Sequence, residues 1–301
     1  MSEIHGILNI YKPPGPTSFQ VVSRVKRWTG VKRVGHGGTL DPQASGVLPV
    51  ALGQANRIIE YLHSDSKVYR AQIEFGQTTD TYDAMGKTVS RADPSLVTLN
   101  KLRETLDTYK GSIWQTPPPY SAIRYQGHHL YELTRAGIQV PIAPRQVNIY
   151  RLELLNWDSP ILELEVECSK GTYIRSLTHD IGQALGCGAY LKGLSRERYG
   201  PFSAEDSVSL DKFEIACKEG MWVELLYPVD EVLFSWQAVI LGEEKEKAVR
   251  QGKRIDWGEQ NTLVKKCRAY NISGCFVGVL KNENGDSQWG PEKVFNLTLS
   301  S

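Results

Sequence analysis

Residues 35–49 read Gly-His-Gly-Gly-Thr-Leu-Asp-Pro-Gln-Ala-Ser-Gly-Val-Leu-Pro. One carboxylate, Asp41, stands between glycines and Pro42, and an apolar segment follows directly. Because proline fixes a backbone angle and the apolar segment anchors the turn in a core, we expect Asp41 to be held on a fixed loop. Such a loop is either structural or a means of presenting a single carboxylate to a substrate.

The bulk properties indicate an ordinary globular protein. A chain of 301 residues is long enough for a large core and two domains. Its five cysteines are odd in number and form no C-x-x-C pair, which argues against a disulfide framework or a zinc site and suits a reducing cytoplasm. No apolar run approaches the roughly 18 residues of a membrane span, and no secretory signal is visible. We therefore expect a cytoplasmic protein without a membrane segment.

Charge is distributed unevenly although the net charge is only +1. Residues 1–200 carry 23 Lys and Arg against 18 Asp and Glu, whereas residues 201–301 carry 12 against 16. Five of the early cations, between Arg24 and Arg33, directly precede the Asp41 loop. This pattern is typical of either a solvated helix face or a surface for a polyanion.

The first 234 residues read as one α+β domain. Helices are expected after Thr17 or Ser18, after Thr98 and around residues 174–185, ending at Gly30, Gly111 and Gly186. Strands are expected at residues 7–16, 46–52, 69–75, 147–157 and 161–168, and residues 204–230 as a helical connection. Because these strands do not alternate regularly with crossover helices, we predict a mixed, largely antiparallel sheet with flanking helices.

Two further segments stand apart from this pattern. Residues 115–145 begin with a stiff run of prolines and contain a short helix around 129–136, which suggests an insertion used for binding. From residue 235 the sequence pattern changes to short apolar segments typical of β-strands. Residues 235–301 are predicted to form a small domain with a helix at 242–251 and strands near 262–266, 275–280 and 294–299.

The residues of the Asp41 loop do not fit several common kinds of active site. It lacks the Gly-Lys-Ser/Thr of a phosphate-binding loop, no serine sits in a nucleophile elbow to complete a triad with His36, and no second His or Cys cluster suggests a metal. A lone carboxylate can also act at the C1′ carbon of a sugar, assisted by an aromatic ring and a cation. Tyr69 and Arg175 are candidates, although such a tyrosine is commonly core and such an arginine commonly exposed.

The Asp41 loop resembles the catalytic-aspartate motif of the bacterial tRNA pseudouridine-55 synthases, the TruB family. Further segments resemble the family's other motifs in the same order. Together, the matching segments are Tyr11–Pro13, Gly35–Leu48, Tyr69–Asp83, Pro118–Glu132, Gly171–Leu177 and Leu191–Arg196. One departure is Arg124, where a lysine is more usual. Residues 247–252 more weakly resemble a PUA-type RNA-binding domain. The resemblance implies a pseudouridine synthase fold over residues 1–234, with an RNA-binding insertion at about 115–145, and a PUA-like domain over 235–301.

The resemblance also implies a reaction. The uridine at position 55, in the T-arm of tRNA, would be flipped out, detached at N1 and rejoined through C5, which requires no cofactor or metal. Asp41, Tyr69 and Arg175 would be catalytic, with Arg175 pairing with Asp41 and Tyr69 stacking on uracil. The remaining expected RNA-site residues are His36, which would fill the space of the flipped base, Tyr173 and Leu194, which would line the pocket, and Lys12 and Pro13, which would support the loop.

Some alternatives remain open at this point. Asp41 either attacks C1′ or assists loss of the C2′ proton. The archaeal and eukaryotic relatives use guide RNA and partner proteins, whereas the bacterial branch implies a monomer acting alone. A non-catalytic RNA-binding module and a nucleoside hydrolase are the competing classes.

Overall fold

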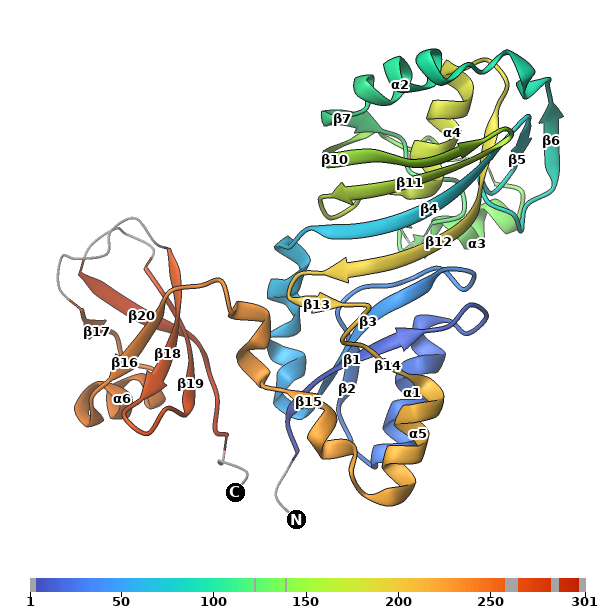
Figure 1. Ribbon diagram of the computed structural model, residues 1–301. Helices are drawn as coiled ribbons and strands as arrows, with labels where there is room; N and C mark the ends of the chain where they lie inside the picture. Colours follow the sequence, from blue (N-terminus) through green and yellow to red (C-terminus); the bar gives the residue numbers. More distant parts are fainter. Residues whose placement is uncertain (1–3, 122, 139, 258–264, 283–286, 298–301) are drawn as a thin grey trace.

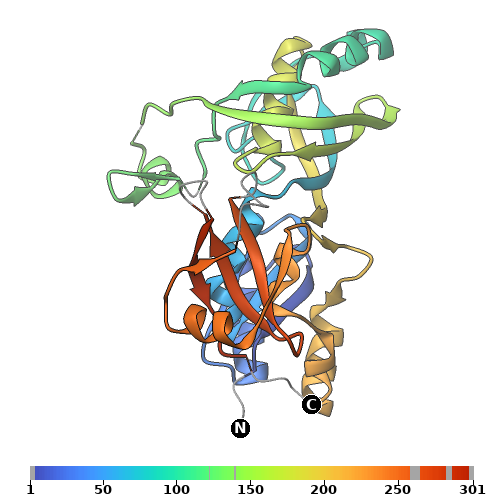
Figure 2. The ribbon, with the colours of Figure 1, turned by 90° about the vertical axis from the view of Figure 1, so that its left-hand side faces the viewer.

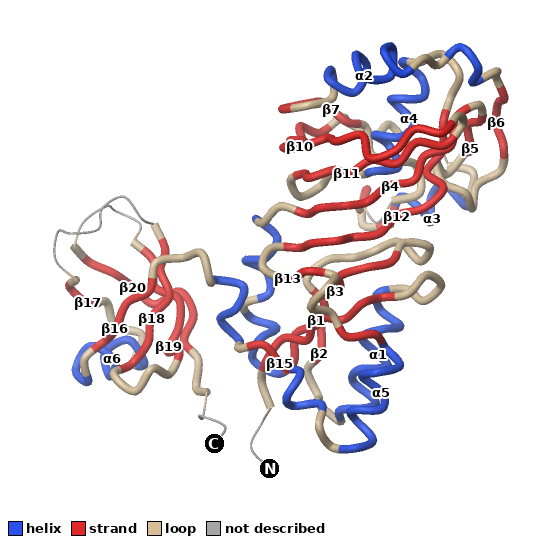
Figure 3. Tube along the Cα trace, viewed as in Figure 1, coloured by secondary structure: helices blue, strands red, loops and turns tan. Residues whose placement is uncertain are grey.

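The computed structural model describes residues 4–121, 123–138, 140–257, 265–282 and 287–297. Its main feature is a long mixed sheet of 11 strands within these residues (Figure 1; Figure 3). The strand order is β14 (Val208–Ser209), β1 (Gly6–Lys12), β3 (Ser45–Leu52), β12 (Ala189–Tyr199), β4 (Lys67–Phe75), β11 (Ile161–Cys168), β10 (Arg145–Asp158) and β7 (Gly111–Gln115), with β2 (Val34–His36) on β3, β13 (Phe202–Ser203) on β12 and β15 (Leu226–Tyr227) on β1.

Most neighbours in this sheet are antiparallel, as the strand pattern predicted. Parallel pairing occurs between β1 and β14 and, over a short stretch, between β3 and β12. In β4 the side chains of Tyr69, Ala71, Ile73 and Phe75 are buried on one face, which confirms the alternation seen in the sequence. The register sets Tyr69 between Val166 of β11 and Arg196 of β12.

Helices lie in two groups beside the sheet (Figure 1). α1 (Ser18–Thr29) packs beside α5 (Leu210–Glu219) near β1, and α2 (Leu99–Thr108) packs beside α4 (Ile174–Ala184) near the other end. The predicted boundaries follow from local chemistry. Thr17 caps α1 through a capping box with Gln20, and Gly30 ends it in a left-handed conformation. One buried core cluster draws side chains from both groups.

The insertion after β7 holds little regular structure. It contains the hairpin of β8 (Arg124–Tyr125) and β9 (His128–His129), followed by the short helix α3 (Leu130–Arg135). Figure 2 shows this green segment reaching away from the main sheet. A second hairpin, of β5 (Gln77–Thr79) and β6 (Thr88–Arg91), lies beyond the end of β4.

The prediction for residues 204–230 was only partly right. α5 is helical, but β14 and β15 on either side of it add two-residue strands to β1, so the segment extends the sheet edge as well as connecting domains. Strands this short carry too few residues for a period-two pattern. Short 3-10 helices at Trp222–Leu225 and Val229–Leu233 complete the segment.

As far as its residues are described, the C-terminal part is a curled five-stranded sheet with one helix, α6 (Glu243–Arg250). Its strand order is β16 (Ala238–Leu241), β18 (Lys266–Asn271), β19 (Phe276–Lys281), β20 (Gln288–Val294) and β17 (Ile255–Asp256). The sequence predicted one of these strands, β19, at 275–280, and it missed β16 and β17. Its other two strands were displaced: the one at 294–299 begins where β20 ends, and the one at 262–266 ends where β18 begins, with residues 262–264 outside the described residues.

The two parts share a core. Phe276 and Phe295 of the C-terminal part belong to one buried cluster with Ile7 of β1 and with side chains of the 3-10 helices at Gly53–Arg57 and Ile59–Ser64. No helix in the described ranges has the length and apolarity needed to cross a bilayer.

Candidate active site

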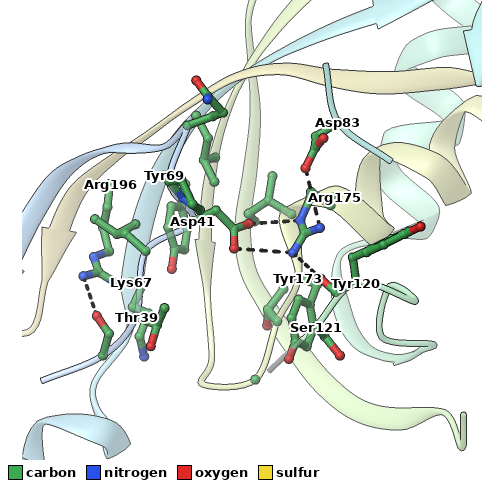
Figure 4. Close-up of a pocket in the computed structure, with 18 of the residues that line it drawn as sticks. Thr39, Asp41, Lys67, Tyr69, Asp83, Tyr120, Ser121, Tyr173, Arg175 and Arg196 are labelled. Carbon is green, nitrogen blue, oxygen red and sulfur yellow. Dashed lines mark hydrogen bonds and ion pairs between the residues drawn. The ribbon is translucent and has the colours of Figure 1, made fainter. Parts of the chain in front are cut away.

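A cavity of about 1120 Å³ opens between the Asp41 loop, β4, β12, the start of α4 and the root of the insertion. It collects five of the residues that the sequence singled out: Asp41, Tyr69, Tyr173, Arg175 and Leu194. These positions are more than 150 residues apart at the extremes, and Figure 4 shows the side chains of Asp41 and Arg175 pointing toward each other and in contact. His36, Lys12 and Pro13 do not line it.

Asp41 and Arg175 form the central ion pair. Nε of Arg175 lies 3.0 Å from Oδ2 of Asp41, and Nη2 donates to Oδ1 at 3.4 Å. The Arg175 side chain is 8% exposed and that of Asp41 is 43% exposed, so the carboxylate faces the cavity while the cation is buried behind it. Arg175 also donates to the carbonyl oxygens of Thr81 and Tyr120, and Asp83 lies 3.5 Å from Nη1. Arg175 is therefore fixed from several sides.

Lys12 holds the Asp41 loop from below. Its buried Nζ donates to the carbonyl oxygens of Pro13, Pro16 and Pro42 at 2.9, 2.9 and 3.0 Å. Burial lowers the pKa of Lys12 to about 8. The ammonium therefore binds carbonyl oxygens of the chain itself, and the supporting role of Lys12 and Pro13 stays a prediction.

Buried side chains from β12 hold the same loop from the other side. Arg196 donates to the carbonyl oxygens of Val47 and Gly38 at 2.7 and 3.2 Å. The hydroxyl of Tyr199 donates to the carbonyl oxygen of Gly37 at 2.9 Å. Because strands β3 and β12 are neighbours, these bonds fasten the loop to the centre of the sheet.

His36 lies in β2, where it pairs with Val50 of β3, and it is half-buried. It stands one residue before Gly37, whose N–H donates to the carbonyl oxygen of Pro49. The structure thus places His36 beside the Asp41 loop but outside the cavity lining, and its role toward a flipped base stays a prediction.

The aromatic residues give the cavity its apolar wall. Tyr69 is buried, and burial raises the pKa of its phenol. Tyr173 is the cap residue of α4, and burial raises its pKa as well. Gln115 accepts from the N–H of Tyr173 at 2.7 Å and donates to its carbonyl oxygen at 3.0 Å, which ties the root of the insertion to α4.

Sequence reasoning did not single out several charged residues that line the cavity, among them Lys67, Asp83, Lys170 and Arg196. Lys67 stands two residues before Tyr69 on β4, and burial lowers its pKa to about 8. Asp83 and Arg196 are the last residues of two of the segments that resemble family motifs. A charged residue at that position was the sequence feature that could have identified them. Among the described residues, no group of three or more His, Cys, Asp or Glu side chains is arranged to hold a metal ion.

Comparisons with known proteins agree with the geometry. Residues 26–174 match the TruB family pseudouridylate synthase N-terminal domain, and residues 175–233 match the tRNA pseudouridylate synthase B C-terminal domain. The chain is 45% identical over 290 residues to a tRNA pseudouridine synthase B of Dehalococcoides mccartyi, covering 96% of each chain. It is 38% identical to one of Clostridium perfringens, covering 93% of this chain and 96% of the relative.

Solved structures show the same architecture. One chain of a Cbf5-Nop10-Gar1 complex has a TM-score of 0.73 at 27% identity, covering 96% of this chain and 84% of that one. A chain of an H/ACA RNP bound to a substrate RNA containing 2′-deoxyuridine has a TM-score of 0.73 at 26% identity, covering 97% and 85%. With two family domains matched in order and near full-length relatives, the chain belongs to the TruB family of pseudouridylate synthases.

Proposed function

We propose that this chain isomerises the uridine at position 55 of tRNA, in the T-loop, to pseudouridine, with Asp41 as the catalytic carboxylate. The observation that carries this proposal is the exposed Asp41 carboxylate paired with the buried Arg175 in a cavity that also contains Tyr69. The full-length relatives named tRNA pseudouridine synthase B support the same substrate.

The reaction balances without an external reagent. The bond from C1′ to N1 of uracil breaks, a bond from C1′ to C5 forms, C5 loses a proton and N1 gains one. Base flipping brings the nucleotide to Asp41, which either attacks C1′ or assists loss of the C2′ proton. Arg175 orients Asp41 and keeps the carboxylate aimed at the sugar.

Tyr69 is assigned to the base. A tyrosine on the buried face of β4, in the cavity beside Asp41, can stack on uracil. Since burial raises the pKa of Tyr69, its phenol stays protonated at neutral pH. This protonation state supports stacking as its main role, because a neutral phenol cannot accept the C5 proton unless it first gives up its own.

The rest of the molecule is assigned to tRNA binding. The insertion at about 115–145 lines the cavity through Arg135 and Arg145, and the cations between Arg24 and Arg33 are proposed as a further tRNA-binding surface outside the cavity lining. Phosphates are expected to supply part of the affinity. We assign the catalytic domain to residues 1–234 and a PUA-like RNA-binding domain to 235–301. We expect a monomer that acts on tRNA in the cytoplasm without guide RNA or partner protein.

The test is pseudouridine formation in unmodified tRNA with purified protein and no added cofactor. Asp41→Asn should lower the single-turnover rate by about 10³-fold or more while tRNA binding is largely kept. Asp107→Asn, a change at an exposed carboxylate of α2 outside the cavity, is the matched control. Tritium release from uridine labelled at C5 measures the rate.

Each competing class predicts a different outcome. Normal tritium release from the Asp41→Asn variant would contradict the catalytic assignment. Stoichiometric free uracil would identify a nucleoside hydrolase, and binding without turnover by the unaltered protein would identify an RNA-binding module. Turnover only after addition of a guide RNA would place the chain with the guide-dependent relatives.

A further inference from the structure

We infer that Lys67, together with Lys170, binds a phosphodiester group adjacent to the flipped uridine. This inference rests on the proposed function and adds a binding site for the RNA backbone within the same cavity. It begins from the position of Lys67, the first residue of β4, two residues before Tyr69. Side chains two residues apart on a strand share a face and lie about 7 Å apart.

The side chains of Tyr69, Lys67 and Lys170 all line the cavity, but at different depths. Tyr69 is buried, whereas Lys67 is half-buried and Lys170, in the turn after β11, is exposed. Figure 4 shows Lys67 beside Tyr69 on the side of the cavity opposite Arg175. A nucleotide whose base reaches Tyr69 therefore has its backbone near the two lysines.

Lys67 differs from Arg175 and Arg196 in what its charged group contacts among the described residues. Arg196 uses its N–H groups on two carbonyl oxygens, and Arg175 is paired with Asp41. Within the described ranges, Lys67 has no hydrogen bond or ion pair, and its Nζ lies 4.2 Å from the ring centre of Tyr199. Its donors are therefore available to a ligand.

The surrounding charges favour an anion at this place. The register pairs Lys67 with Cys168, which brings the turn carrying Lys170 beside it. Burial, with smaller contributions from the charges of Arg196 and Lys170, lowers the pKa of Lys67 to about 8, whereas Cys168 and Asp65 act in the opposite direction. A phosphate would supply a counter-charge that the chain provides only weakly.

The two cavity carboxylates do not fill this need. Asp41 and Asp83 both face Arg175, so their charge is directed to the far side of the cavity. The uracil carbonyl oxygens carry no net charge, whereas a phosphodiester is an anion, so only the backbone offers the ammonium an opposite charge as well as a hydrogen-bond acceptor. The position and charge of Lys67 thus favour the backbone over the base.

A double-mutant cycle between protein and RNA tests the contact. The substrate is a T-arm hairpin with either natural phosphodiesters or one neutral methylphosphonate, placed on the 5′ or the 3′ side of the target uridine. Single-turnover pseudouridine formation against enzyme concentration gives the half-saturating concentration and the maximal rate. The variants are Lys67→Met, Lys170→Met and the control Lys192→Met, a β12 lysine that pairs with Glu74 outside the cavity.

Lys67→Met should raise the half-saturating concentration about tenfold or more and leave the maximal rate within about twofold. With the unaltered protein, one of the two methylphosphonates should raise the half-saturating concentration by a similar factor. With Lys67→Met, the same methylphosphonate should cause no further increase. Lys170→Met should show the same coupling with a smaller effect. Lys192→Met should show none.

The inference would be overturned if the effects of the lysine variant and of the methylphosphonate on the half-saturating concentration simply added. This would have to hold at both phosphate positions and for both Lys67→Met and Lys170→Met. A fall in maximal rate with unchanged half-saturation would also overturn it, because Lys67 would then act on the base. If Lys67→Met does not fold, the cycle with the exposed Lys170 decides by the same criterion. Failure of the proposed function is distinguishable, because the unaltered protein would then form no pseudouridine in the natural hairpin.

Discussion

Arg175 is the residue through which the two sides of the cavity are joined. A buried guanidinium is costly unless its charge is paired and its donors are satisfied. Here Asp41 and Asp83 supply the charge, and the carbonyl oxygens of Thr81 and Tyr120 accept two further bonds. The loop of Asp41, the β5–β6 region and the insertion therefore meet at one side chain of α4, and this side chain orients the carboxylate of Asp41.

Asp180 on the same helix gives a prediction about pH. Burial raises the pKa of its carboxyl to about 6, whereas an unfolded aspartate titrates near 4. Between these values the folded state binds more protons, so stability falls as pH rises towards 6 and the cost persists above it. Asp180→Asn should raise the Tm more at pH 8 than at pH 5. Equal shifts at both pH values, like those expected for exposed Asp107→Asn, would contradict this.

The site could be predicted from sequence in its identities but not in its geometry. Asp41, Tyr69 and Arg175 stand in recognisable motifs, and all three line the cavity. An arginine in the first turn of a helix is commonly exposed, and the burial of Arg175 depends on Thr81 and Tyr120, far away in the chain. Lys67 was missed because a lysine at a strand end is ordinarily a solvated residue, and only the fold places it in the cavity.

At the scale of elements, Gly46 lies where the Asp41 loop enters the sheet. Its φ is +106°, and a Cβ there would lie 2.3 Å from the carbonyl oxygen of Arg196 on the parallel neighbour β12. Gly46→Ala therefore adds a backbone clash to the conformational strain and should cost more than about 2 kcal/mol. Gly220→Ala, at φ +77° with no atom within 4 Å, carries the strain alone and should cost about 1 kcal/mol.

Urea unfolding of the two glycine variants measures this difference. Equal losses would show that the approach of β12 to Gly46 does not constrain the loop. A drop in the maximal rate of Gly46→Ala beyond its loss of folded protein would further indicate that the Asp41 loop shifts with the strand.

Elements with local signals were predicted well. Alternation identified β4 and β11, and caps identified the starts of α1 and α2. Pairings between distant segments were not predicted, because two-residue strands such as β14 have no period and the parallel contact of β3 with β12 joins residues about 150 positions apart. The sheet order is thus a property of long-range packing rather than of local pattern.

At the scale of the whole molecule, the C-terminal part is packed close to the Asp41 loop. Phe295 shares a buried cluster with Ile59 and Leu62 of the 3-10 segment. Those same two side chains pack against Gly37, where a Cβ would lie 2.8 Å from Leu62. Arg57 of the preceding turn lies over the Phe295 ring and donates to the carbonyl oxygen of Val294. A continuous line of contacts thus runs from β20 to the Asp41 loop.

Phe295→Ala tests whether this line of contacts stabilises the site. Removing a fully buried phenylalanine should cost about 3–5 kcal/mol and should speed amide exchange in residues 53–64 and 36–41, with a lower maximal rate. Trp289→Ala is the matched control, since Trp289 is equally buried but lies in the separate core of the C-terminal sheet. If both variants change exchange in residues 53–64 alike, the effect is general destabilisation. Faster exchange there in Phe295→Ala alone would show that the C-terminal part supports the catalytic loop through this shared core.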